Sequence, residues 1–414
     1  MGTYIKRDCY LEQLKPFIGT NVIKILTGMR RTGKSVMLEL IRDELSLQGV
    51  SADRFITLNF EDSAYAQLRE PAALEAYVVE HMSRNGKEAG TFYLFFDEIQ
   101  EVASWESCIN SLRATRDVDI YITGSNSHLL SGELATFLSG RYITCTIYPF
   151  SFAEYLSLRA ARRKETEQDS EPLSAGFNAY LQQGGMPFVV DLDMPQSARQ
   201  RYLNDLFDSV ILKDIVRRNN VRSVDQLQRI CDFALANVGK TFSATSISNY
   251  FINERRPIAT ETVINYLRYC TEAYLLYKAN REDLIGKRVL SVNEKYYCID
   301  HALRDAVTNS SNRNIAQTLE NVVYLELLRR GYEVSVGKAH DLEVDFVARC
   351  GGERHYIQVA YLLTTPETIE REERVFAQIP DHYPRHLISL DEIDMSANGI
   401  RHHYLPQFLL DESW

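Results

Sequence analysis

Short apolar runs recur through the first 150 residues of the chain, separated by segments with helical periodicity. The runs are continuous, which is typical of strands buried on both faces of a sheet. We expect five such strands, at residues 22–26, 55–60, 92–96, 118–123 and 142–147. Helices are expected between them, beginning near residue 36 and over residues 71–86, 105–113 and 129–138. This alternation predicts a doubly wound α/β fold with a ligand crevice at the carboxyl ends of its strands.

The pattern changes after residue 150. Residues 159–172 are charged and poor in apolar side chains, which predicts an exposed loop, and residues 197–218 have helical periodicity. Three more helices and then two strand-like pieces are expected, at residues 227–236, 243–251, 260–276, 275–278 and 288–292. Three helices and a hairpin in this order predict a winged helix-turn-helix.

The C-terminal part begins with a helix expected over residues 315–330 and ended by Gly331. Strands are expected at residues 332–336, 343–348 and 355–359. Glu320 lies in the helix, Asp345 in the middle strand and Gln358 in the third strand. A helix and three strands with these residues form the skeleton of a restriction-endonuclease-like α/β domain.

An active nuclease of that kind needs a lysine two residues beyond the third acidic position, to activate water beside a metal ion. This chain has an amide at that position, Gln358, and Ala360 in place of the lysine. We therefore expect no metal-dependent cleavage, and cleavage that is nevertheless observed would mean that a lysine from elsewhere, such as Lys338, has taken the missing place. Other pairs of metal-binding residue types are more typical of packed or solvated side chains: Cys298 with His301, and His402 with His403.

The first strand ends at a glycine-rich segment that matches G-x-x-x-x-G-K followed by Ser or Thr. In such a loop the backbone N–H groups point at the β-phosphate, Lys34 bridges the β and γ oxygens, and Ser35 ligates Mg²⁺. A helix begins at once, and its dipole adds to the anion site. The residues expected to bind ATP here are Gly28, Met29, Arg30, Arg31, Thr32, Gly33, Lys34 and Ser35.

Polar residues follow the other strands. Asp97 is expected to hold Mg²⁺ through water, and Glu98 to polarise the attacking water. Ser125 or Asn126 is a candidate sensor of the γ-phosphate. Arg141 can act as an arginine finger in cis or from a neighbouring subunit, and it fits a surface residue equally well. The second strand is followed by three residues that suit either a site or a solvated loop: Asn59, Glu61 and Asp62.

Composition narrows the class of protein. Apolar residues make up 45% of the 414 residues and charged residues 25%, as in ordinary soluble globular proteins. No run approaches the roughly 20 apolar residues of a bilayer helix, so we expect no membrane span and a cytoplasmic location. The seven cysteines lie far apart, which implies neither disulfides nor zinc. The net charge of −10 argues against a wide surface for nucleic acid.

A local DNA contact stays open. The third helix of residues 225–300 offers Thr262, Asn265 and Arg268, which can face a groove. The hairpin adds three cations that can face the backbone: Arg281, Lys287 and Arg288. Neighbouring acids reduce the positive electrostatic potential of these cations: Glu261, Glu272, Glu282 and Asp283. Contact with a protein partner is therefore an equal alternative to DNA.

The order of the segments TGMRRTGKS, FFDEIQ, ITGSNS, LSGR, YPFSFAEY, YLQQGGMP, KYYCIDHALR, EVDFVA and YIQVAY resembles a large prokaryotic family of AAA-like ATPases with a C-terminal domain of unknown function. The resemblance implies ATP binding, a winged-helix middle and a nuclease-like end that is often degenerate. By position, residues 28–35, Asp97, Glu98, Ser125 and Arg141 carry over. Ala360 departs from the pattern of an active nuclease.

These patterns predict four regions: a P-loop AAA-like ATPase core at 1–156, a helical linker or lid at 157–224, a winged helix at 225–300 and a degenerate nuclease-like domain at 301–414. We expect an Mg²⁺-dependent ATPase with Lys34, Glu98 and Arg141 as catalytic residues. Its nucleotide state would move the C-terminal domains, on DNA or a protein partner, in a homo-oligomer if Arg141 acts in trans. The alternatives are a nucleic-acid-binding regulator with structural ATP and, disfavoured by Ala360, an ATP-controlled nuclease.

Overall fold

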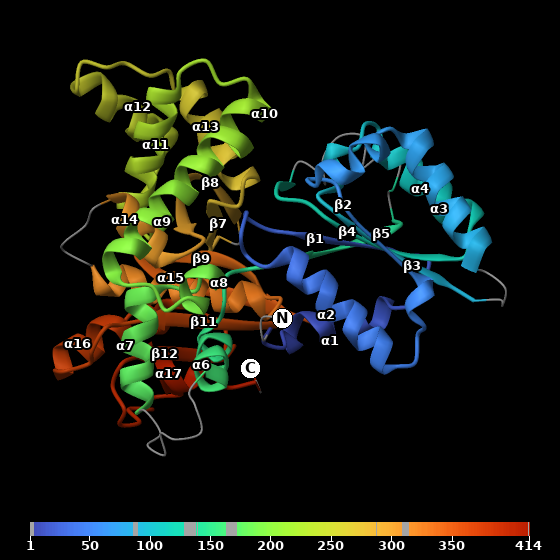
Figure 1. The fold of residues 1–414 in the computed structure, drawn as a ribbon. Coiled ribbons are helices and arrows are strands. Elements are labelled where there is room, and N and C mark those ends of the chain that lie inside the picture. Colours follow the sequence, from blue (N-terminus) through green and yellow to red (C-terminus); the bar gives the residue numbers. More distant parts are fainter. Residues whose placement is uncertain are drawn as a thin grey trace. The chain divides into compact units, whose positions relative to one another are not determined.

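The computed structural model describes residues 4–85, 90–127, 138, 140–162, 172–286, 288–308, 314–412 and 414 (Figure 1). The chain forms two compact units. Unit 1 comprises Met1–Ile147 and the short segment Glu272–Tyr274, and unit 2 comprises Tyr148–Thr271 and Leu275–Trp414. The chain therefore enters unit 2 after Ile147 and returns to unit 1 only for Glu272–Tyr274.

Unit 1 is built on a five-stranded sheet in which neighbouring strands are parallel, in the order β2-β3-β4-β1-β5. The strands are β1 Ile23–Thr27, β2 Phe55–Asn59, β3 Phe92–Asp97, β4 Val118–Thr123 and β5 Tyr142–Thr146. All five expected strands are confirmed within one residue at each end, because continuous apolar runs mark strands that are covered on both faces. The α/β fold of this unit is also as expected.

Helices cover both faces of this sheet. They are α1 Asp8–Leu14, α2 Lys34–Leu47, α3 Pro71–Asn85 and α4 Trp105–Thr115. Figure 1 shows α2 on one side of the strands and α3 with α4 on the other. Leu74 of α3 and Ile109 of α4 pack in one core with Ile25, Leu58 and Phe96 of the sheet. The helix expected over residues 129–138 lies outside the described residues, apart from Leu138.

Short 3-10 turns complete unit 1, at Lys15–Phe17, Ala52–Arg54, Ser63–Arg69 and Ile99–Glu101.

Unit 2 begins with helices α6 Phe152–Arg162, α7 Leu173–Gln183, α8 Pro187–Asp191 and α9 Gln196–Ser209. The loop expected over residues 159–172 is wrong at its start, since α6 continues to Arg162, and residues 163–171 lie outside the described residues. Arg159 Nη1 donates to the Tyr155 hydroxyl at 2.9 Å and Arg162 pairs with Asp191, so these charges have partners that periodicity does not reveal.

The expected helix at 197–218 is confirmed, because a π-helical stretch at Val210–Val216 and α10 Arg217–Asn219 continue α9. The next three helices are α11 Val224–Ala236, α12 Ala244–Asn253 and α13 Thr260–Glu272. The third ends four residues earlier than the expected Leu276. Tyr274 adopts a left-handed φ of 57°, and the Leu275 N–H bonds back to the Cys270 carbonyl at 3.0 Å, which ends the helix.

The sheet of unit 2 has eight strands in the order β13-β12-β11-β10-β9-β7-β8-β6. Their bounds are β6 Thr241–Phe242, β7 Leu276–Asp283, β8 Arg288–Cys298, β9 Glu333–Ala339, β10 Leu342–Cys350, β11 Glu353–Val359, β12 Arg385–Ser389 and β13 Ile400–Tyr404. Strand β7 pairs in parallel with β9, so one sheet crosses the boundary that the sequence suggested at residue 300. Both β7 and β8 are longer than expected, because they carry charged residues whose partners lie on other elements.

The remaining helices of unit 2 are α14 His301–Thr308, α15 Ile315–Arg329, α16 Pro366–Glu373 and α17 Leu405–Phe408, with a 3-10 turn at Phe376–Gln378. Most residues of α15 are buried, including Asn321 and Glu326, so this helix lies inside unit 2.

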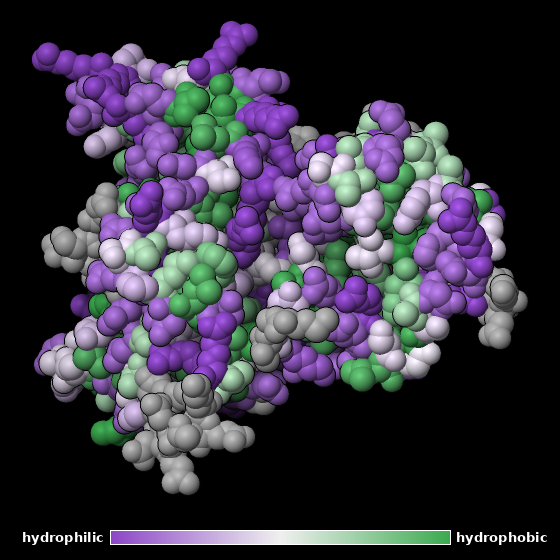
Figure 2. All heavy atoms as spheres, viewed as in Figure 1, coloured by the Kyte–Doolittle hydropathy of each residue, from purple (hydrophilic) through white to green (hydrophobic). Residues whose placement is uncertain are grey.

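Figure 2 shows a hydrophobic patch among hydrophilic residues near α13. Tyr250, Ile252 and Ile264 of α12 and α13 are exposed. Within the described ranges, every helix is too short or too polar to cross a membrane.

Candidate nucleotide site and C-terminal ion cluster

The glycine-rich segment forms a tight loop between β1 and α2. Gly28 and Gly33 have φ values of 135° and 99°, and Arg31 between them has a φ of 67°. A Cβ atom on Gly28 would lie 2.4 Å from the Ile147 carbonyl oxygen, so only glycine fits there. Helix α2 starts at Lys34, directly after Gly33. The loop therefore has the strained turns and the helix N-terminus that an anion site of this kind needs.

Lys34 is held at this loop. Its side chain is 5% exposed, and Nζ donates to the carbonyl oxygens of Gly28 at 3.0 Å and Met29 at 3.1 Å. The Thr32 hydroxyl donates to the same Met29 carbonyl at 3.0 Å. A buried ammonium bonded to neutral carbonyls gains a stronger partner when a phosphate is present. The donors present therefore fit the triphosphate of a nucleotide.

The two expected magnesium ligands lie together at the carboxyl end of β3. The Ser35 side chain hydrogen-bonds to the Asp97 carboxylate, and Asn59 Nδ2 donates to Asp97 Oδ2 at 3.2 Å. Burial raises the pKa of Asp97, while its hydrogen bonds to Thr123 and Ser35 act in the opposite direction. A carboxylate and a hydroxyl in this arrangement are oxygen ligands suited to Mg²⁺.

Glu98 follows in a strained backbone conformation with a φ of 52°. Its N–H donates to Thr123 Oγ1 at 2.9 Å, and the same hydroxyl donates to Asp97, so Thr123 joins the two acids. The Gln100 side-chain amide donates to the Glu98 carboxylate. Sequence reasoning missed Thr123 and Gln100. The available signal for Thr123 was its place at the carboxyl end of β4, in the same crevice as Asp97.

The residues after β2 and β4 have different roles. The Gly124 N–H donates to the Leu26 carbonyl at 3.1 Å, which brings the fully buried Ser125 and Asn126 close to the end of β1. Among the residues left open after β2, Asn59 joins the site through Asp97. Glu61 pairs with Arg30 of the loop at 3.0 Å. The third, Asp62, accepts the Ala64 N–H at 2.9 Å and so caps a turn.

Arg141 lies at the amino ends of the parallel strands, whereas the phosphate loop lies at their carboxyl ends. Strands β1 and β5 are parallel, with Ile23 opposite Tyr142 and Thr27 opposite Thr146. Arg141 precedes β5, whereas the loop follows Thr27, which is roughly 13 Å further along at about 3.3 Å per residue. Its guanidinium donates to Asn110 Oδ1 at 3.2 Å. The expectation that Arg141 acts in cis is therefore wrong, and action in trans stays a prediction.

In unit 2 the structure brings Glu320, Asp345 and Gln358 together. Asp345 Oδ2 accepts the Val359 N–H at 2.9 Å, and the Asp345 N–H donates to Gln358 Oε1 at 3.2 Å. Gln358 Nε2 donates to Glu372 at 3.1 Å. The amide at position 358 is therefore engaged on both sides by neighbouring groups.

The lysine of this cluster is Lys295 of β8, which sequence reasoning missed. Its Nζ lies 3.0 Å from Glu320, 2.7 Å from Glu343 and 3.8 Å from Asp345, and the side chain is 5% exposed. Burial lowers the pKa of Lys295, but the three carboxylates outweigh burial and raise it above its usual value. Burial also raises the pKa of Asp345, to about 8. Lys295 thus lies within the acid cluster as an ammonium bonded to Glu320 and Glu343.

The other candidate ligands are packed. His301 Nε2 lies 3.0 Å from the Tyr180 carbonyl oxygen, and burial raises the pKa of Cys298 to about 12. His402 contacts Ser389 at 2.8 Å, and His403 contacts His386 at 2.9 Å. Across the described part of the chain, no group of three or more His, Cys, Asp or Glu side chains is arranged to hold a metal ion.

The residues expected to face DNA are only partly available. Thr262, Asn265 and Arg268 keep exposed surface on α13. Arg281 is different, because its side chain is 12% exposed and donates to Glu343 at 3.3 Å. The prediction that Arg281 contacts DNA is therefore wrong. Lys287 lies outside the described residues, as does the side chain of Arg288.

Two family models match parts of the chain. A family model described as an AAA domain matches residues 20–156, and a domain of unknown function (DUF8612) matches residues 174–314. An uncharacterized protein of Haemophilus influenzae is 38% identical over 98% of both chains. An uncharacterized protein of Methanocaldococcus jannaschii is 30% identical over 86% of this chain and 78% of its own.

Among solved structures, a Walker-type ATPase of Pyrococcus abyssi is similar over 74% of this chain and 96% of its own, with 15% identity and a TM-score of 0.48. The ORC1 protein of Aeropyrum pernix in complex with DNA is similar over 75% of this chain and 94% of its own, with 12% identity and a TM-score of 0.34. The two relatives show that the chain belongs to one family with them, and the family model shows that residues 20–156 of this family member form an AAA domain.

Proposed function

We propose that this protein is an Mg²⁺-dependent ATPase whose nucleotide state controls unit 2. The observation that carries the proposal is the meeting of Ser35 and Asp97 beside the loop, with Glu98 next in the chain. One hydroxyl, one carboxylate and a second acid at this edge are the groups that nucleotide hydrolysis needs. In this proposal Glu98 is the group that distinguishes hydrolysis from binding alone.

The residues have separate roles in this proposal. The loop amides and Lys34 bind the phosphates. Ser35 and Asp97 would hold Mg²⁺, which would neutralise part of the phosphate charge. Asn59 and Thr123 fix the Asp97 carboxylate. Glu98 polarises the attacking water and accepts its proton, and the Gln100 amide restrains the Glu98 carboxylate until then.

Control of unit 2 is supported by where the chain leaves unit 1. Ile147, the last residue of unit 1 before the first crossing, donates its N–H to the Thr27 carbonyl at 2.8 Å, and its own carbonyl lies against Gly28. Tyr274, in the segment that returns to unit 1, shares a hydrogen bond with the Thr27 side chain. Both crossings are thus attached to the residues where the phosphate loop begins.

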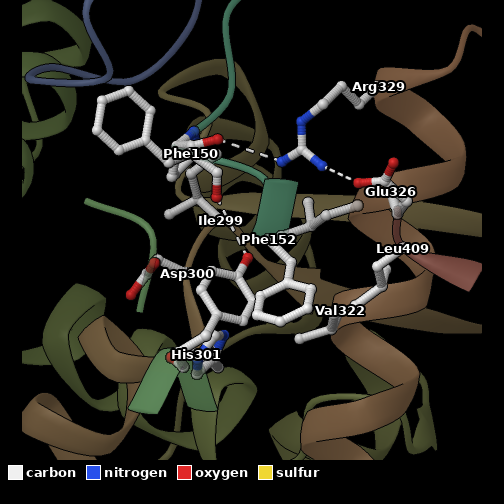
Figure 3. A pocket seen from close by; sticks show the side chains of 12 residues that line it. Phe150, Phe152, Ile299, Asp300, His301, Val322, Glu326, Arg329 and Leu409 are labelled. Atoms are coloured by element: carbon white, nitrogen blue, oxygen red, sulfur yellow. Dashed lines mark hydrogen bonds and ion pairs between the residues drawn. The ribbon is translucent and has the colours of Figure 1, made fainter. Parts of the chain in front are cut away.

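Inside unit 2 the first crossing is held firmly. Arg329 Nη2 donates to the Pro149 carbonyl at 3.2 Å, and the Tyr180 hydroxyl donates to the Phe150 carbonyl at 3.2 Å (Figure 3). The Phe150 N–H donates to the Gly185 carbonyl at 2.7 Å. A displacement of the loop would therefore reach unit 2 through a short and restrained stretch of backbone.

Turnover and binding of ATP test the proposal together. Lys34→Ala should lose most ATP affinity, and Glu98→Gln should bind ATP but lose turnover by a factor of about 100 or more, as expected when a catalytic acid or base is removed. Glu101→Gln is the matched control, since Glu101 is an exposed acid in the turn that follows Glu98. Unchanged turnover in Glu98→Gln would reject Glu98 as the residue that activates water, and binding of ATP without turnover in the wild type would leave a regulator with structural ATP.

The partner of unit 2 is proposed to be a protein. Exposed apolar side chains lie on α13, the helix of the groove-facing candidates, at Ile264, and on α12 at Tyr250 and Ile252. Arg281 is withdrawn into an ion pair. Apolar surface suits a protein contact better than a phosphate backbone. ATP turnover measured with and without DNA, over a range of salt, decides this point. Salt-sensitive stimulation by DNA would overturn the choice of a protein.

A further inference from the structure

Arg7 is a buried arginine beside the phosphate loop. Its side chain is 2% exposed, although it lies just before α1 and far from the loop in sequence. Nη1 donates to the Thr32 carbonyl at 3.0 Å. The guanidinium also lies 4.6 Å from the centre of the Tyr10 ring, which fixes its position by a cation–π contact. The N-terminal segment therefore places a permanent positive charge at the loop.

The contact has a stereochemical consequence. In a trans peptide the carbonyl of Thr32 and the N–H of Gly33 point in opposite directions. A carbonyl drawn toward Arg7 therefore turns the Gly33 N–H away from Arg7. The guanidinium is also close to Gly33, since a Cβ there would lie 3.5 Å from Arg7 Nη1. With a φ of 99°, this glycine can hold the turned peptide without a steric penalty.

We infer that Arg7 is a positioning residue of the nucleotide site, which orients the Gly33 N–H for the β-phosphate by holding the Thr32 carbonyl. The inference rests on the proposed nucleotide binding. Because a loop of this type grips the β-phosphate, Arg7 should matter for ATP and ADP and have little effect on AMP. A purely structural arginine would instead affect stability and all nucleotides alike.

The test compares Arg7→Met with Lys6→Met. Methionine keeps most of the apolar length of arginine without its donors, and Lys6 is the adjacent, exposed lysine that pairs with Asp8. Dissociation constants for ATP, ADP and AMP are measured for each protein, with melting temperatures in the absence of nucleotide. Arg7→Met should weaken ATP and ADP at least tenfold and AMP less than threefold. Lys6→Met should match the wild type.

Arg7→Lys provides a second variant in case Arg7→Met does not fold. It keeps the charge with a shorter reach, so its preference for ADP over AMP should fall between those of the wild type and Arg7→Met. If the variant that folds has the same ratio of dissociation constants for ADP and AMP as the wild type, the inference is overturned. Lys34→Ala distinguishes failure of the role proposed for Arg7 from failure of the proposed nucleotide site. Loss of ADP binding there, with normal binding in Arg7→Met, rejects the role of Arg7 alone, whereas normal binding in both rejects the nucleotide site as well.

Discussion

Replacement of Lys295 by methionine tests how the C-terminal acids are stabilised. The substitution removes the ammonium that lies 3.0 Å from Glu320 and 2.7 Å from Glu343, and leaves both carboxylates with Asp345. Removing one partner of a buried ion pair costs about 3–5 kcal/mol. The lower end applies here, because Glu343 is 28% exposed and keeps Arg281, and Glu320 keeps the Tyr297 hydroxyl at 2.7 Å.

For a unit of this size, a loss of about 3 kcal/mol lowers the melting temperature by roughly 6–12 °C. The assay is thermal unfolding at pH 8, with hydrogen exchange in β10 and β11 to assign the transition to unit 2. Lys278→Met is the matched control, because Lys278 of the neighbouring strand pairs with Glu294 at the surface and should contribute less than about 1 kcal/mol. A Lys295→Met protein that melts within 2 °C of the wild type would refute the argument.

The pH dependence of stability provides an independent check. The pKa of Asp345 in the folded chain, about 8, lies above its ordinary value of 3.8, so the folded state binds this proton more tightly than the unfolded state. The stabilisation by this proton is complete below pH 3.8 and is lost as the pH rises through 8. Asp345→Asn should therefore flatten the stability profile between these values. A profile identical to that of the wild type would contradict a buried, proton-binding Asp345.

Three further outcomes are expected. If Arg141 acts in trans, ATP turnover per chain should rise with protein concentration, and mixing the Arg141→Ala and Lys34→Ala proteins should restore partial activity. Turnover per chain that does not change with concentration, from a protein that is a monomer, would exclude action in trans. No cleavage of single- or double-stranded DNA is expected with Mg²⁺ or Mn²⁺, because the Lys295 ammonium already neutralises the acids, and cleavage that disappears in Asp345→Ala would reverse this conclusion. Tyr274→Phe should keep ATP affinity within about threefold of the wild type, since the loop and Lys34 are untouched. It should also reduce nucleotide-dependent changes of hydrogen exchange in α13 and β7, and undiminished changes would reject this route.

The geometry of the candidate nucleotide site follows from the sequence to a large extent, because its main groups are encoded locally. Residues 28–35 and the pair Asp97–Glu98 each follow a continuous apolar run, and the parallel sheet brings the ends of such runs to one edge. Arg7 could not be found in this way, since its contact with Thr32 depends on how α1 packs. The role of Arg141 was left open between action in cis, action in trans and a surface position, and the parallel pairing of β1 with β5 places it at the edge opposite the loop because it precedes its strand.

The C-terminal unit was less predictable for a related reason. Strands β7 and β8 carry buried charges, such as Arg281 and Lys295, whose partners are supplied by α15 and β10. Hydropathy places such residues at the surface, so the predicted strands stopped too early. Lys295 was missed because only positions near residue 360 were considered for a lysine, whereas Lys295 lies on β8, before residue 300.

The pairing of β7 with β9 bears on how this protein can be divided for expression. Asn280 to Asp283 lie opposite Ser335 to Lys338, and this parallel ladder joins the segments on either side of residue 300. A fragment that stopped at residue 300 would leave the β7 edge without its neighbour, and one that began there would lose Lys295 and uncover β9. Exposed strand edges promote aggregation. Recombinant pieces of unit 2 should therefore keep both segments on one polypeptide, or be co-expressed as complementing halves.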